Sequence, residues 1–143
     1  MSRRRAVACL GALGQAMTRI LVIDDDREVC VLLTRILARE GFDVVEADSG
    51  KVALARMREE PFDVVVTDIV MPDTNGIEVI TALRRSYPNT KIVGISGGGQ
   101  IKSSSYLEMA SMIGANVTLA KPFTPNELIS AVATALSAGS SRG

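Results

Sequence analysis

Four short apolar runs of this sequence each end in a side chain that could do chemistry. Asp24 and Asp25 follow ILVI, and Asp68 follows FDVVVT. Ser96 follows KIVGI, and Lys121 follows VTLA. Three carboxylates within a few ångströms of one another repel, and a hard divalent cation relieves that repulsion. If the four ends meet in space, the sequence therefore predicts a cation site beside a hydroxyl and an ammonium group.

Magnesium is the cation that this residue set favours, because it binds through a few carboxylates and keeps waters that a phosphate can replace. Lys121 and Ser96 can then contact phosphoryl oxygens that the metal does not reach. An aspartate can act as the nucleophile and form an acyl phosphate. Each residue alone also fits a plain turn, helix cap or surface position. Only the occurrence of all these side chains together, each at the end of a separate apolar run, indicates phosphoryl transfer.

Composition narrows the class of protein. The chain has 143 residues, of which 47% are apolar and 22% charged, as expected for one globular domain. It contains no histidine, which excludes phosphohistidine chemistry and imidazole bases on this chain. Residues 18–143 carry thirteen basic and sixteen acidic side chains, a net charge of minus three. We therefore expect no nucleic-acid partner.

Strand-like apolar runs alternate with amphipathic helical windows from Thr18 onward, which predicts β-α units and a parallel sheet. Five repeats of this size favour an α/β, doubly wound, five-stranded sheet in the order 2-1-3-4-5. In that topology the carboxyl ends of the strands meet at one edge, where ligands bind. The expected strands are 20–23, 42–46, 62–67, 91–95 and 117–120, and the expected helices are about 27–40, 51–60, 77–86, 106–113 and 125–136.

Three of the expected helices carry cap signals at their first turn. Asp26 and Ser49 can cap the first two helices, and Thr124 with Glu127 forms a capping box around Pro125. Each of the first three helices is expected to carry an apolar stripe. The stripe of the first helix is Val29, Leu32, Leu33 and Ile36. That of the second is Val52, Leu54, Ala55 and Met57, and that of the third is Ile77, Ile80 and Leu83.

The expected domain covers residues 18–137. Residues 1–17 are interpreted as a poorly ordered extension, or as an over-long start with Met17 as the true first residue, and residues 138–143 as a disordered tail. The apolar stretch 6–16 is too short to span a bilayer, so no membrane association is expected. Two cysteines are too few for a disulfide framework, and Cys30 is expected to be a buried, reduced thiol. The cytoplasm is the expected location.

Four segments, ILVIDDD, DVVVTDIVMPDTNGIEVI, KIVGISGG and LAKPF, resemble in order and spacing the receiver domain of two-component response regulators. The resemblance covers residues 18–137 and is closest to stand-alone, chemotaxis-regulator-like receivers with a flavodoxin-like fold. It implies that Asp68 is phosphorylated. It also implies that Asp25 ligates Mg²⁺ directly and that Asp24 helps, partly through water. The Val70 carbonyl would complete the metal site.

The same resemblance implies that Ser96 is the switch hydroxyl and that Lys121 contacts the phosphoryl group. It also implies that the peptide bond between Lys121 and Pro122 is cis. Thr118 stands where many receivers carry an aromatic switch residue, and Tyr106 could only substitute from elsewhere. Val70 and Gly98 have no hydrogen-bonding side chain near the acyl phosphate, so we hypothesise slow self-dephosphorylation. A phosphoryl half-life of seconds would contradict this. Glycines 97–99 fit a functional hinge or a flexible linker.

Partners follow from the resemblance as well: a histidine kinase or histidine phosphotransfer protein as donor, and a downstream target protein or a relay histidine as recipient. Val29, Cys30 and Leu33 are candidates for donor docking, although packing in the core explains most of them. The chain would catalyse only its own phosphorylation and slow dephosphorylation, so it is not expected to be an enzyme.

Two other interpretations remain open. One is an aspartate-nucleophile phosphohydrolase using Asp24 and the acid Asp26, which Arg27 and Glu28 disfavour because that family's motif differs there. The other is an interaction module independent of phosphate.

Overall fold

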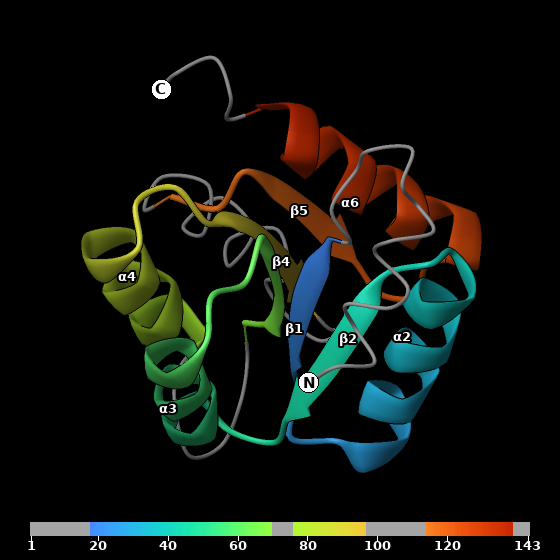
Figure 1. Ribbon diagram of the computed structural model, residues 1–143. Coiled ribbons are helices and arrows are strands. Elements are labelled where there is room, and N and C mark those ends of the chain that lie inside the picture. Colours follow the sequence, from blue (N-terminus) through green and yellow to red (C-terminus); the bar gives the residue numbers. More distant parts are fainter. Residues whose placement is uncertain (1–17, 70–75, 97–113, 139–143) are drawn as a thin grey trace.

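A five-stranded parallel sheet forms the centre of the molecule (Figure 1). The structure is a computed structural model that describes residues 18–69, 76–96 and 114–138. Its strand order is β2-β1-β3-β4-β5, which confirms the predicted order. The strands are β1 (Arg19–Ile23), β2 (Asp43–Ala47), β3 (Val64–Asp68), β4 (Lys91–Ser96) and β5 (Val117–Ala120).

Helices cover both faces of this sheet. Those described are α2 (Arg27–Arg39), α3 (Gly50–Glu59), α4 (Gly76–Ser86) and α6 (Pro125–Ala138). Figure 1 shows α3 and α4 on one face and α2 with α6 on the other. None of these helices is long and apolar enough to cross a membrane.

The alternation of side chains along the central strands creates two apolar layers. Ile20 and Val22 of β1 pack in the layer under α2 and α6, whereas Leu21 and Ile23 pack in the layer under α3 and α4. All five residues of β3 are buried, as expected for a strand covered on both faces. This double cover explains why the apolar runs are continuous.

The predicted helix caps are present. The Asp26 carboxylate accepts hydrogen bonds from the amides of Glu28 and Val29, and the Ser49 hydroxyl accepts one from Val52. Thr124 and Glu127 form the reciprocal capping box, with donor–acceptor distances of 2.8 and 3.1 Å. These bonds fix where the chain turns from a strand end into a helix.

The predicted apolar stripes were partly wrong. Leu32 is 52% exposed, and the buried face of α2 consists of Cys30, Leu33, Ile36 and Leu37. Likewise Val52 is 37% exposed on α3, where Ala53 and Met57 face the sheet. Each helix turns a face toward the sheet that is rotated about its axis from the predicted one. Packing against the sheet, rather than the local apolar pattern, decides which face is buried. The expected helix 106–113 and residues 97–99 lie outside the described residues.

Arg84 ties α4 to the segment that enters β5. Its guanidinium donates hydrogen bonds to the carbonyls of Pro88, Thr90 and Gly114 and to Asn116 Oδ1, at 2.8 to 3.0 Å. Gly114 has φ +130°, and a Cβ there would lie 2.9 Å from Arg84 Nε. Glycine is therefore required by both backbone conformation and space.

Replacing Arg84 with alanine should cost about 3 kcal/mol of unfolding free energy, because four hydrogen bonds to a charged group are lost together. Urea denaturation measures this loss. The neighbouring Arg85 is exposed, so Arg85→Ala should change stability by less than about 0.5 kcal/mol. Equal losses for the two variants would contradict the role assigned to Arg84.

Candidate functional site

The carboxyl ends of the strands bring the predicted site residues to one edge of the sheet. Carboxylate oxygens of Asp24, Asp25 and Asp68 all lie within 4.8 Å of one another. The Lys121 ammonium is 3.6 Å from Asp24 Oδ2 and 3.5 Å from Asp68 Oδ2. Residues at the carboxyl ends of three different strands therefore meet, as the sequence predicted.

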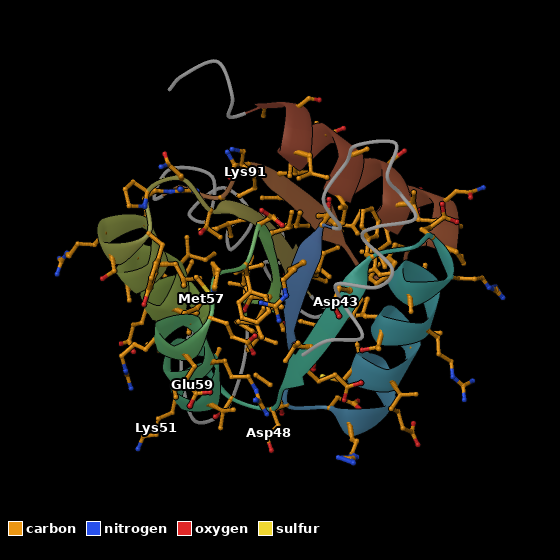
Figure 2. The ribbon with its side chains drawn as sticks, viewed as in Figure 1. Asp43, Asp48, Lys51, Met57, Glu59 and Lys91 are labelled. Atoms are coloured by element: carbon orange, nitrogen blue, oxygen red, sulfur yellow. The ribbon has the colours of Figure 1, made fainter. Side chains whose placement is uncertain are left out.

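The strand register accounts for this convergence. Asp68 closes β3 and aligns with Ile95 on β4, while Ser96 closes β4 and aligns with Ala120 on β5. Lys121 follows directly, and its amide donates to the Ser96 carbonyl at 2.9 Å. In Figure 2 this end of the sheet is marked by Asp48, where β2 runs into α3, while Lys91 marks the opposite end at the start of β4.

Asp24 is the most constrained of the three acids. It is 1% exposed, its Oδ1 accepts the Asp26 amide at 2.9 Å, and its Oδ2 accepts no hydrogen bond within the described part of the chain. Burial raises the pKa of the Asp24 carboxyl, and the charges of Asp25 and Asp26 add to the rise. The hydrogen bond from Asp26 and the Lys121 ammonium act in the opposite direction. A buried carboxylate in this state is stabilised by an added cation.

The donor set fits Mg²⁺. Two buried carboxylates and one exposed carboxylate offer hard oxygen ligands, and the exposed Asp25 leaves the group open to water on one side. Among the described residues Asp24 Oδ2 accepts no hydrogen bond, and its one charged neighbour is the Lys121 ammonium at 3.6 Å, so this oxygen can serve as a metal ligand. Val70, whose carbonyl the resemblance adds to this set, lies outside the described residues.

Ser96 presents a second unpartnered polar atom. Ser96 is 1% exposed, and its Oγ has no hydrogen-bond partner among the residues that the structure describes. A buried hydroxyl without a partner is costly, which marks this position as one where a ligand oxygen would be stabilised. The peptide bond between Lys121 and Pro122 is cis, as the resemblance implied.

Two positioning contacts were not foreseen from the sequence. The Cys30 thiol donates to the carbonyl of Asp24 at 3.4 Å, and the Thr67 hydroxyl donates to the carbonyl of Asp68 at 3.0 Å. Cys30 is four residues after the Asp26 cap, and helical spacing brings such a residue back over the strand end. That spacing was the available signal for Cys30.

Of the two explanations for the apolar residues Cys30 and Leu33 of α2, docking is wrong and core packing is confirmed. Cys30 and Leu33 are 3% and 1% exposed and belong to the core, so they cannot contact a partner. Val29 is only partly buried against the same core. The exposed large apolar residues of this helix are Val31 and Leu32 instead.

A hollow of about 320 Å³ adjoins the acidic cluster between α2, α3 and the end of β2. Its lining includes Asp24, Asp25 and Cys30, followed by residues of β2 and α3. The hollow leaves this side of the acidic cluster without close packing. Side chains of both charge signs line it: Arg27, Arg56, Glu46 and Asp48.

Asp24→Asn should raise the stability of the metal-free protein by about 1 kcal/mol, because the substitution removes a buried charge whose pKa is raised by desolvation. The melting temperature in chelator should rise accordingly. Addition of Mg²⁺ should stabilise the wild type more than the variant. Asp48→Asn, at an exposed position, is the control. A lower melting temperature for Asp24→Asn in chelator would contradict the assigned electrostatics.

Comparison with known families gives one match to more than half of the chain. The family model for the response regulator receiver domain matches residues 20–133.

Individual relatives agree with this match. The transcriptional regulatory protein CpxR of Escherichia coli is 35% identical over 116 residues, which cover 81% of this chain and 48% of CpxR. The chain thus spans about half the length of that relative. The chemotaxis protein CheY of Thermotoga maritima is 33% identical over 80% of this chain and 93% of its own length. A CheY-like receiver domain structure from Methanospirillum hungatei superposes with a TM-score of 0.77 at 28% identity, covering 89% of this chain and 99% of that one.

Proposed function

Because this chain belongs to the family of response regulator receiver domains, we propose that it accepts a phosphoryl group on Asp68 with the help of Mg²⁺ and thereby switches partner binding or relays the phosphate. Receiver domains are signalling domains. The observation that carries the proposal is the grouping of Asp24, Asp25 and Asp68, with the Lys121 ammonium paired to Asp24 and Asp68.

The phosphoryl transfer uses groups that this chain already aligns. An oxygen of the Asp68 carboxylate attacks phosphorus, and the bond from phosphorus to the donor breaks with its electron pair leaving on the donor atom. The Lys121 ammonium, 3.5 Å from Asp68 Oδ2, offsets the negative charge brought by the phosphoryl oxygens. The Ser96 hydroxyl, buried and without a partner, would donate to one of those oxygens. Mg²⁺ held by Asp24, Asp25, Asp68 and the Val70 carbonyl would supply the remaining charge neutralisation.

The switch would run through the β4–β5 end of the sheet. A move of Ser96 toward the phosphoryl group displaces the carbonyl that accepts the Lys121 amide, and so couples the two strand ends. Thr118 pairs with Gly94 in the middle of β5 and is partly buried. No aromatic ring can rotate at that position, so the conformational change is a population shift carried by Ser96 and Lys121.

The phosphodonor is a group outside these 143 residues, because they contain no histidine. A histidine kinase or histidine phosphotransfer protein is the proposed donor. Leu32 and Val31, 52% and 37% exposed on α2, are the large apolar residues that support docking there. The buried free thiol of Cys30 suits a reducing compartment, so we place the reaction in the cytoplasm. Residues 18–137 are proposed as the functional unit.

Beryllium fluoride, a mimic of the phosphoryl group, tests this proposal. With Mg²⁺ present it should shift the amide signals of Ser96 and Lys121 in the wild type, and it should leave those of Asp68→Asn unchanged. Without Mg²⁺ neither protein should respond. Signals that stay fixed under all conditions would instead favour an interaction module independent of phosphate.

A further inference from the structure

We infer that the Cys30 thiol is a positioning residue that holds residues 24–26, the acidic turn, in the geometry that binds the cation. The inference rests on the proposed function, because it assigns a role around the same metal site. It concerns a residue that would not touch the metal or the phosphoryl group itself.

Three hydrogen bonds hold Asp24 as the chain leaves β1. Its amide donates to the Ala47 carbonyl at 3.2 Å, and its Oδ1 accepts the Asp26 amide at 2.9 Å. Its carbonyl accepts the Cys30 thiol at 3.4 Å. The main chain of Asp24 is therefore fixed toward β2 on one side and toward α2 on the other.

Cys30 also joins the ends of two strands. Its Sγ lies 3.9 Å from the Ala47 carbonyl oxygen, in addition to its contact with Asp24. The thiol thus lies between the carbonyls at the carboxyl ends of β1 and β2. Because Cys30 is 3% exposed, water does not compete for this hydrogen bond.

Packing alone does not hold the acidic turn. Asp24 and Cys30 are buried at the inner edge of the hollow of about 320 Å³, whereas Asp25, which also lines it, is exposed and has open space on the side toward α3. Where side chains do not interlock, hydrogen bonds must fix the direction of the main chain. A small rotation at Asp24 would move both neighbouring carboxylates relative to Asp68.

The variants separate hydrogen bonding from volume. Cys30→Ser keeps a hydroxyl donor, Cys30→Val fills slightly more than the thiol's volume without a donor, and Cys30→Ala removes both the donor and the volume. We expect the valine and alanine variants to bind Mg²⁺ about three- to tenfold more weakly, the equivalent of one modest hydrogen bond. Serine should retain an affinity within about twofold of the wild type.

The experiment is a Mg²⁺ titration of the full chain, followed by calorimetry or amide signals, with the melting temperature measured in parallel. Val132→Ala is the matched control, since Val132 is fully buried in the same core but on α6. It should lower the melting temperature without changing Mg²⁺ affinity. The alanine variant provides the comparison if Cys30→Val does not fold.

Equal Mg²⁺ affinity in the wild type, Cys30→Ala and Cys30→Val would overturn the inference, as would an equal loss in Val132→Ala. Absence of Mg²⁺ binding by the wild type would also overturn it. The titration contains no phosphodonor, so failure of the proposed function is seen separately, as absence of phosphoryl incorporation by a wild type that binds Mg²⁺ normally.

Discussion

Asp68→Asn is expected to abolish phosphoryl incorporation from acetyl phosphate, down to the level of a sample without donor. The amide oxygen carries no negative charge and is a poor nucleophile, so no acyl phosphate forms. The substitution also removes one of the three carboxylates that face the cation. Intact-protein mass spectrometry after incubation with Mg²⁺ and the donor measures the fraction of chains that gained one phosphoryl group.

Asp48→Asn is the matched control, because Asp48 is an exposed aspartate that follows the neighbouring strand β2. It should be labelled like the wild type. Normal labelling of Asp68→Asn would rule out Asp68 as the acceptor. If Asp24→Asn alone lost labelling and the wild type turned over phosphomonoesters, the aspartate-nucleophile hydrolase would be the better interpretation.

Lys121→Met is expected to change two properties in opposite directions. The Lys121 ammonium lies within 3.6 Å of an oxygen of both Asp24 and Asp68, so its removal leaves the carboxylates more negative. Mg²⁺ affinity should rise about threefold to tenfold, since a nearby positive charge no longer opposes the cation. Phosphorylation should slow by roughly a hundredfold, because a group that stabilises the transferring phosphoryl oxygens is gone.

Mg²⁺ titration and the rate of labelling by acetyl phosphate measure these two effects on the same samples. Lys51→Met serves as the control, since Lys51 is exposed on α3. Its affinity and rate should match the wild type. Weaker Mg²⁺ binding together with unchanged labelling in Lys121→Met would contradict the role assigned to this lysine.

The sheet was predictable because its strands are continuous apolar runs bounded by caps and turn residues. Strand β5 begins and ends where the sequence predicted, and β2 is shifted by one residue. The buried face of α2 was less predictable. Leu32 and Leu37 are both leucines near the edges of one stripe, and the angle at which the helix packs on the sheet decides which of them is buried.

Convergence of the site residues was also predictable, because parallel strands present their carboxyl ends at one edge. Their environments were not. Asp24 is buried and Asp25 exposed although they are neighbours, since successive residues at a strand end point to opposite sides. The spacing of Cys30 from the Asp26 cap places it on the first turn of α2, but the way α2 folds back over β1 decides whether its thiol reaches the Asp24 carbonyl. The roles of Asp24, Asp25, Asp68, Ser96 and Lys121 stay predictions until they are measured.

Direct identification of the phosphorylated residue tests the central claim most directly. The wild-type chain would be incubated with acetyl phosphate and Mg²⁺, reduced with borohydride to trap any acyl phosphate, digested and sequenced by mass spectrometry. We predict that the reduced residue is Asp68 and that it is absent when Mg²⁺ is chelated. Trapping at Asp24 or any other residue, or no trapped residue with Mg²⁺ present, would contradict phosphoryl acceptance at this site.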